Sequence, residues 1–176
     1  MRRGRGAGVS GMIPVNAAYL PLTDNAPLVI ALEHGLAEEE GIDLRLTRLA
    51  AWPSVNEMLV NGRLDAAPML APLAVATSIG INGRGARLSA PFKLNVNGNA
   101  LVMTTEFAVR MGSDPARRIA DPIGAARDFA HALRAMDRRP VIGVVHRYST
   151  HALILRYFLG QAGVNPDREV TLEVLP

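Results

Sequence analysis

The tripeptide Ser149-Thr150-His151 has the chemistry to hold a small anion. It follows the apolar run 141–145, which predicts a buried parallel strand leading into a helix capped by Ser149. The first backbone N–H groups of such a helix favour negative charge. Thr150 can donate from its hydroxyl, and His151 can donate from either ring nitrogen or add charge when protonated. The alternative is plain helix capping, with His151 packed or solvated.

Two further groups could line an anion site. The amides of Asn97 and Asn99 can donate to oxyanions, although Asn97-Gly98 also predicts a hairpin turn that needs no ligand. Trp52 is the only tryptophan and follows a predicted strand. Its ring could wall a small cleft or cover the edge of the core.

Enzyme signatures are missing from this sequence. There is no cysteine, no Gly-x-Ser-x-Gly elbow, no phosphate-binding loop and no dinucleotide fingerprint. His146 and His151 stand five residues apart, which does not place them on one helical face, and no His-Glu-x-x-His motif occurs. We therefore expect no catalytic residue, no metal and no cofactor, and binding without turnover.

The charge pattern gives little indication of nucleic-acid binding. The formal net charge is +3, and Lys93 is the only lysine among 19 basic residues. The arginines between residues 110 and 139 are interleaved with aspartates, which favours a solvated helix face, with an anionic partner as the alternative. With 49% hydrophobic residues and 5% aromatic residues, the core is expected to be aliphatic.

Short apolar runs alternate with helical patterns from residue 13 onward, which predicts an α/β fold with a mostly parallel sheet. Asn25 is expected to cap a helix, and Ser54 with Glu57 forms a capping-box signature. Strands are predicted over 42–49, 64–69, 141–145 and 170–175, helices over 72–79 and 123–136, extended segments over 88–94 and 100–104, and a loop over 112–122.

We expect four parts along the chain. They are a disordered leader at 1–12, a partial first αβ lobe at 13–104, a helical insert or linker at 105–139 and the start of a second αβ lobe at 140–176.

Three motifs together give a resemblance to a known family: Pro-Leu-Thr-Asp-Asn-Ala-Pro-Leu at 21–28, Leu-Asp-Ala-Ala-Pro-Met-Leu-Ala-Pro at 64–72 and Asn-Val-Asn-Gly-Asn-Ala at 95–100. The chain resembles the nitrate and bicarbonate binding proteins of bacterial ABC importers, from about residue 13 to 176, with a weak segment at 105–139. The resemblance implies a type II periplasmic-binding-protein-like fold, here one lobe plus an incomplete second. It also implies an ABC permease or regulatory protein as partner.

The same resemblance implies ligand roles for Trp52, Asn97 and Asn99, and it favours Thr150 and His151 as anion ligands. Members of the family run to about twice this length, so we expect the segment that completes both lobes to be missing.

Two alternatives remain open. A cytoplasmic nitrate or nitrite sensor built on the same fold would control a regulatory partner protein. An enzyme like the thiamine-pyrimidine precursor synthases would need a cofactor lysine, and Lys93 has no supporting motif.

Residues 1–22 contain no apolar run of the length of a signal sequence, and nowhere does the chain approach the roughly 20 apolar residues of a membrane span. As written, the chain is expected in the cytoplasm, or in the periplasm if the true N-terminus is missing.

Overall fold

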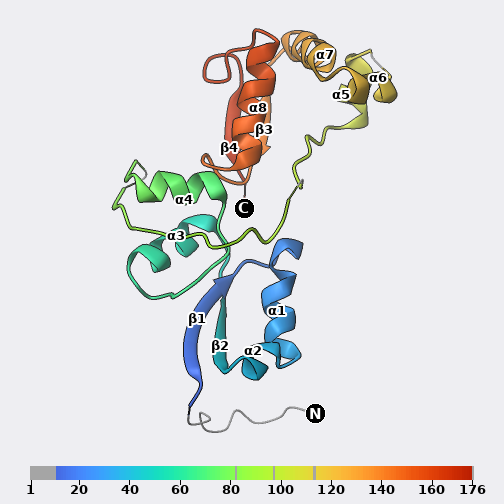
Figure 1. Cartoon of the computed structure of the whole chain (residues 1–176). Coiled ribbons are helices and arrows are strands. Elements are labelled where there is room, and N and C mark those ends of the chain that lie inside the picture. Colours follow the sequence, from blue (N-terminus) through green and yellow to red (C-terminus); the bar gives the residue numbers. More distant parts are fainter. Residues whose placement is uncertain (1–10, 82, 97, 113, 176) are drawn as a thin grey trace. The chain divides into compact units, whose positions relative to one another are not determined.

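The chain forms two compact units in the structure, a computed structural model that describes residues 11–81, 83–96, 98–112 and 114–175 (Figure 1). The first unit is Met1–Asn97 and the second is Gly98–Pro176. Within the described residues each unit contains one two-stranded parallel sheet, which confirms the α/β class. Residues 1–10 of the expected leader lie outside the described residues.

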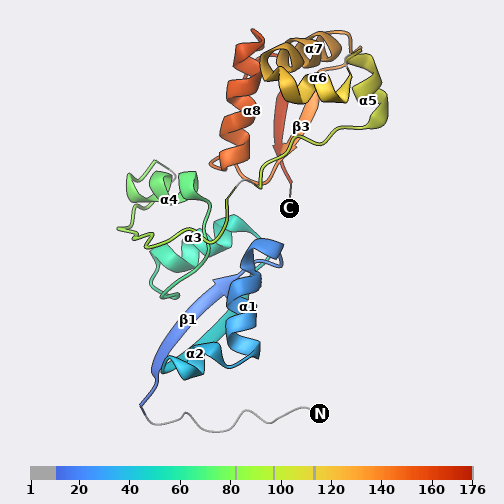
Figure 2. The same ribbon diagram turned by 45° about the vertical axis from the view of Figure 1, so that its right-hand side comes forward.

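The first unit begins with a strand-helix-strand segment. β1 (Ile13–Tyr19) and β2 (Ile42–Arg48) pair in parallel along all 7 residues of each strand. Their connection contains η1 (Thr23–Asn25), α1 (Ala26–Glu33) and α2 (Leu36–Glu39). Parallel strands require such a crossover, and Figures 1 and 2 both show α1 beside the two strands.

The strand predicted over 64–69 is wrong in extent. Only Ala66 bridges to β1. Oδ2 of Asp65 accepts a hydrogen bond from the backbone N–H of Asn16 at 2.8 Å, so a side chain replaces one bond of the strand ladder. Pro68 has no N–H to donate, which prevents regular pairing further along.

The helix predicted to start after the capping-box residue Ser54 begins three residues earlier. α3 (Trp52–Val60) has Ala51 at its N-cap, with extended backbone and no capping side chain. Pro53 lies in the first turn, where backbone N–H groups have no acceptor within the helix, so the N–H that proline lacks is not needed there. Ser54 therefore lies inside the helix, and the capping-box prediction is wrong. α4 (Ala71–Ser78) agrees with the helix predicted there.

Residues 83–96 and 98–104 form no strand. The extended segments predicted over 88–94 and 100–104 are therefore not part of a sheet. A strand needs a neighbour that satisfies its backbone N–H and C=O groups, and no described segment pairs with these residues.

The second unit adds helices before its strands. β3 (Val141–Val144) and β4 (Thr171–Val174) pair in parallel, and α8 (Thr150–Gln161) connects them, which confirms the strands and the helix predicted there. Figure 1 shows β3 and β4 beside α8. The elements of this unit are α5 (Thr105–Arg110), α6 (Pro115–Ala120), α7 (Pro122–Arg134), β3 (Val141–Val144), α8 (Thr150–Gln161) and β4 (Thr171–Val174).

The loop predicted over 112–122 contains α6, so this prediction is wrong. Oδ1 of Asp114 accepts from the backbone N–H of Ala116 at 3.0 Å, and Pro115 occupies the first helical position. An Asp-Pro pair thus begins a helix here instead of interrupting one. Asp121 then caps α7 by accepting from the N–H of Gly124 at 2.8 Å.

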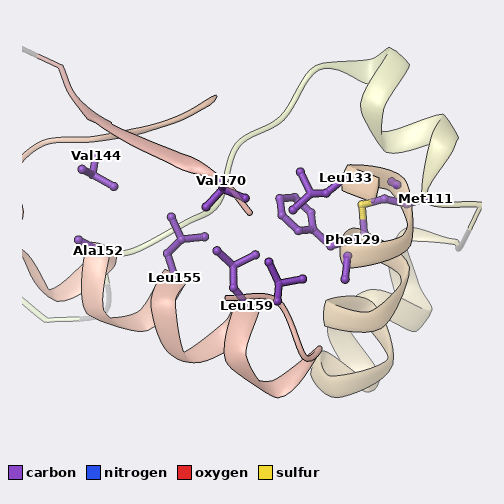
Figure 3. Close-up of a cluster of buried hydrophobic side chains, with 11 residues drawn as sticks. Met111, Phe129, Leu133, Val144, Ala152, Leu155, Leu159 and Val170 are labelled. Atoms are coloured by element: carbon purple, nitrogen blue, oxygen red, sulfur yellow. The ribbon is translucent and has the colours of Figure 1, made fainter. Parts of the chain in front are cut away.

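One apolar cluster forms the core of the second unit (Figure 3). Phe129 and Leu133 on α7 point toward Leu159 on α8 and toward Val170 just before β4. Met111, which follows α5, is also buried in this cluster. The segment 105–139 therefore supplies core side chains to the same unit as β3, α8 and β4.

Within the described part of the chain, no helix has both the length and the apolar character that crossing a membrane requires.

Candidate functional site

The turn between β3 and α8 is built around Ser149. This residue is fully buried, and its Oγ accepts from the backbone N–H of Ala152 at 3.2 Å, which confirms the predicted cap. The same hydroxyl donates to the carbonyl of His146 at 2.7 Å. Because both bonds are satisfied inside the turn, Ser149 fixes the start of α8 and has no hydrogen left to donate to a ligand.

His151 is held by its own loop. Its Nε2 accepts from the backbone N–H of Val145, which directly follows β3, at 3.2 Å. Burial lowers the pKa of His151 below its ordinary value of 6.5. A nitrogen that accepts carries no proton, so this imidazole is neutral and its proton is on Nδ1. The expectation that either nitrogen can donate is therefore wrong, and Nδ1–H is the only donor on this ring.

His146 is a second imidazole that organises the turn. Its Nδ1 accepts from the backbone N–H of Tyr148 at 3.1 Å. Burial, and then the positive charge of Arg147, lower the pKa of His146. From the sequence, His146 is expected only as a candidate metal ligand, and this role is missed. The signal that could have indicated it is the spacing of two residues between the His146 side chain and the N–H of Tyr148, because polar side chains often accept from the backbone N–H two positions later.

Two backbone N–H groups stay open at the helix start. Thr150 and His151 occupy the first positions of α8, and no acceptor for their N–H groups occurs among the residues that the structure describes. Figure 3 shows Ala152, in this first turn, near Val144 at the carboxyl end of β3. The Thr150 side chain is exposed and His151 is half-buried. The structure thus brings together the two residues that were expected to bind an anion.

Trp52 is the first residue of α3 and belongs to the first unit. It is 9% exposed, so its side chain is buried, as either of the two alternatives allows. Its indole N–H donates to no acceptor in the described chain, which leaves a pocket role open as a prediction.

The asparagine pair is only partly described. Asn97 lies outside the described residues, and Asn99 is exposed in a segment without regular structure. The described residues on either side form no strand, and the turn predicted at Asn97-Gly98 includes a residue outside the described ones. No described hydrogen bond joins Asn99 to Thr150 or His151, so its ligand role remains a prediction.

Asn25 is a buried polar residue that the sequence analysis assigned to a cap. It occupies the cap position of α1, but its side chain makes no capping bond. Instead, Nδ2 donates to the carbonyl of Leu20 at 2.8 Å, which ties the end of β1 to the helix start. Among the described side chains, its Oδ1 is the buried polar atom left without a partner.

The fold of this chain matches that of a solute-binding protein. The crystal structure of the periplasmic nitrate-binding protein NrtA from Synechocystis PCC 6803 superposes with a TM-score of 0.73 at 25% sequence identity. The match covers 94% of this chain and 42% of that one. The periplasmic-binding-protein-like fold expected from the sequence is therefore confirmed.

The chain belongs to the NMT1-like family, whose model matches residues 12–176. It is 32% identical to the bicarbonate transport ATP-binding protein CmpC of Synechocystis sp., over 93% of this chain and 23% of that protein. It is 29% identical to the nitrate/nitrite binding protein NrtA of Nostoc sp., over 90% of this chain and 35% of that protein. The chain thus spans about a quarter to a third of the length of these relatives.

Proposed function

We propose that this chain is the solute-binding part of an ABC-type importer for a small oxyanion, nitrate or nitrite ahead of bicarbonate, and that it binds without turnover. The observation that carries the proposal is the bond from the N–H of Val145 to Nε2 of His151, which leaves Nδ1–H as the donor of a fixed ring. The structural similarity to a nitrate-binding protein also supports the proposed solute-binding function.

The donors around the start of α8 suit an anion that only accepts hydrogen bonds. They are the open N–H groups of Thr150 and His151, the hydroxyl of Thr150 and Nδ1–H of His151. The segment 145–151 contains no carboxylate, and Arg147 adds a positive charge to it. Donors held in place by the fold bind an anion at low entropic cost.

The same turn favours nitrate over bicarbonate. Bicarbonate carries one O–H that needs an acceptor, whereas nitrate needs donors alone. Three side-chain acceptors of the turn are already used, since Ser149 Oγ, His146 Nδ1 and His151 Nε2 each accept from a backbone N–H. The hydroxyls of Tyr148 and Thr150 are the side-chain acceptors left in segment 145–151, so the O–H of bicarbonate finds few partners, and burying it without one costs affinity.

The proposal extends to Trp52, Asn97 and Asn99 as further ligand residues on the strength of the family resemblance. It includes a permease of the ABC type as partner, since importers pass the captured solute to one. A solute receptor meets its ligand outside the cytoplasmic membrane, so the proposal also includes a periplasmic location for the whole gene product. Cell fractionation tests the location.

Calorimetric titration with sodium nitrate, nitrite and bicarbonate at constant ionic strength tests the function. We expect nitrate to bind, and His151→Ala and Thr150→Val each to weaken it about 10- to 150-fold, the equivalent of roughly 1.5–3 kcal/mol per hydrogen bond to a charged group. His131→Ala and Thr171→Val are the matched controls, because both residues are exposed and belong to other elements, His131 to α7 and Thr171 to the end of β4 that pairs with Val141.

Equal nitrate affinity in the parent chain and in His151→Ala would refute the site. If none of the three anions binds to the parent chain, the solute-binding function is refuted for this chain on its own.

A further inference from the structure

Two arginines tie together two segments that are far apart in the sequence. Nη2 of Arg134, at the end of α7, donates to the carbonyl of Gly163 at 2.8 Å. Nη2 of Arg139 donates to the carbonyls of Asp167 at 3.1 Å and Val170 at 2.7 Å. The connection from α7 to β3 and the loop before β4 are therefore held at a fixed separation.

A cleft of about 470 Å³ lies between these two segments, which we call the arginine cleft. Its apolar lining includes Leu133, Val164 and Val170, which also belong to the core cluster, and Figure 3 labels the first and last of them. Pro140, which also lines it, immediately precedes β3. The cleft is thus at the amino end of β3, whereas the turn with His151 follows the carboxyl end.

The loop before β4 forms one wall of the arginine cleft, and hydrogen bonds among residues 165–169 hold it in place. Oδ1 of Asn165 accepts from the backbone N–H groups of Asp167 at 3.0 Å and Arg168 at 3.2 Å. The N–H of Asn165 donates to Glu169 at 2.6 Å, and Glu169 also pairs with Arg134. The bond from Asn165 and then the pairing with Arg134 lower the pKa of Glu169, so its carboxylate stays charged at neutral pH.

Two guanidinium groups of the arginine cleft take no part in this network. Arg138 and Arg168 line the cleft, and within the described residues neither side chain has a hydrogen bond or an ion pair. Together with Arg134 and Arg139, they face only two carboxylates, those of Asp137 and Glu169. The lining therefore carries an excess of two positive charges, and the planar fork of each open guanidinium suits the oxygens of a phosphate group.

We propose that the arginine cleft binds a phosphate monoester with an apolar body. A phosphate monoester carries close to two negative charges at neutral pH, which matches the excess charge of the lining, whereas a single carboxylate matches half of it. The apolar floor is Met136, the half-buried apolar side chain of the lining, because Leu133, Val164 and Val170 are 5%, 3% and 2% exposed and belong to the core. The apolar body packs on this side chain. The volume is within the range of small-molecule sites, and the walls need little ordering because Arg134 and Arg139 already fix them.

Titration with phenyl phosphate, followed by calorimetry at constant ionic strength, tests this site. We expect saturable binding by the parent chain and at least a tenfold loss in the double variant Arg138→Gln/Arg168→Gln. Arg127→Gln is the control, because this arginine is exposed on α7 and does not line the cleft. It should leave the affinity unchanged. Saturating nitrate should not displace phenyl phosphate, which separates this result from that of the proposed anion site.

Three results would overturn the proposal. They are no saturable binding of phenyl phosphate, the same affinity in the double variant as in the parent chain, and an equal loss in Arg127→Gln. Inorganic phosphate is titrated alongside, and an affinity equal to that of phenyl phosphate would overturn the role of the apolar floor.

Discussion

The imidazole of His151 accepts a hydrogen bond from the backbone N–H of Val145, so a side chain in the first turn of α8 closes the loop that leads into its own helix. This bond joins the end of β3 to the start of α8 and settles which ring nitrogen carries the proton. The same hydrogen bond therefore orients the ring of His151 and stabilises the turn.

Removing that acceptor should loosen the turn. His151→Ala leaves the N–H of Val145 to water, and we expect a loss of about 1 kcal/mol in the free energy of unfolding, the usual net value of one hydrogen bond. Amide hydrogen exchange at Val145 should become faster, whereas exchange in β1 should be unaffected. Unchanged protection at Val145 would contradict the observed bond.

Stability should depend on pH through His146 and His151. Because folding lowers both pKa values below 6.5, the unfolded chain binds more protons than the folded chain as the pH falls through this region. The contribution is fully present above about pH 6.5 and is lost as the pH falls from there toward the lower folded pKa values.

Urea unfolding at pH 7.5, 6.5 and 5.5 measures this dependence. The double variant His146→Asn/His151→Asn should show a flatter profile between pH 7.5 and 5.5 than the parent chain. A profile as steep as that of the parent chain would assign the effect to other groups.

The buried hydroxyl of Ser149 should matter more than an exposed one. Ser149→Ala removes the cap of α8 and one of the two donors to the carbonyl of His146, which keeps the backbone N–H of Ser149 at 3.2 Å, so we expect a loss of roughly 1–3 kcal/mol. Ser78→Ala is the control, because Oγ of this exposed serine bonds only to the carbonyl of Ala74 in its own helix. Equal effects, measured by urea unfolding, would show that burial of the cap is unimportant.

Phe129 should be the most sensitive aromatic position. Its ring lies 5.1 Å from that of Phe107 and 5.6 Å from that of Phe158, between centroids, and the residue is 3% exposed. Phe129→Ala should lower the free energy of unfolding by about 3–5 kcal/mol. Phe92→Ala, at a residue that is 72% exposed, should change it by less than about 0.5 kcal/mol. A small effect at Phe129 would contradict the core described for the second unit.

Features set by neighbours in the sequence could be predicted well. Ser149 caps α8 as expected, because a cap needs only a residue and the N–H three positions later. Segment 112–122 shows the limit of such reasoning, since Asp114-Pro115 suits both a loop and a helix start, and only the structure distinguishes them.

Contacts between distant segments could not be predicted in the same way. The partner of His151 Nε2 depends on how the chain leaves β3, and the partners of Arg139 lie about 30 residues away in sequence. The strand expected over 64–69 failed for a related reason, since Asp65 bonds to Asn16, across 49 positions, with its side chain.

The position of Trp52 makes the first unit optically distinguishable from the second. It is the only tryptophan of the chain, it is 9% exposed, and it lies in the unit Met1–Asn97. Indole fluorescence therefore reports the environment within that unit, whereas far-ultraviolet circular dichroism reports the helices of both. Unfolding midpoints that differ between these two signals would reveal that the units melt as separate cooperative blocks.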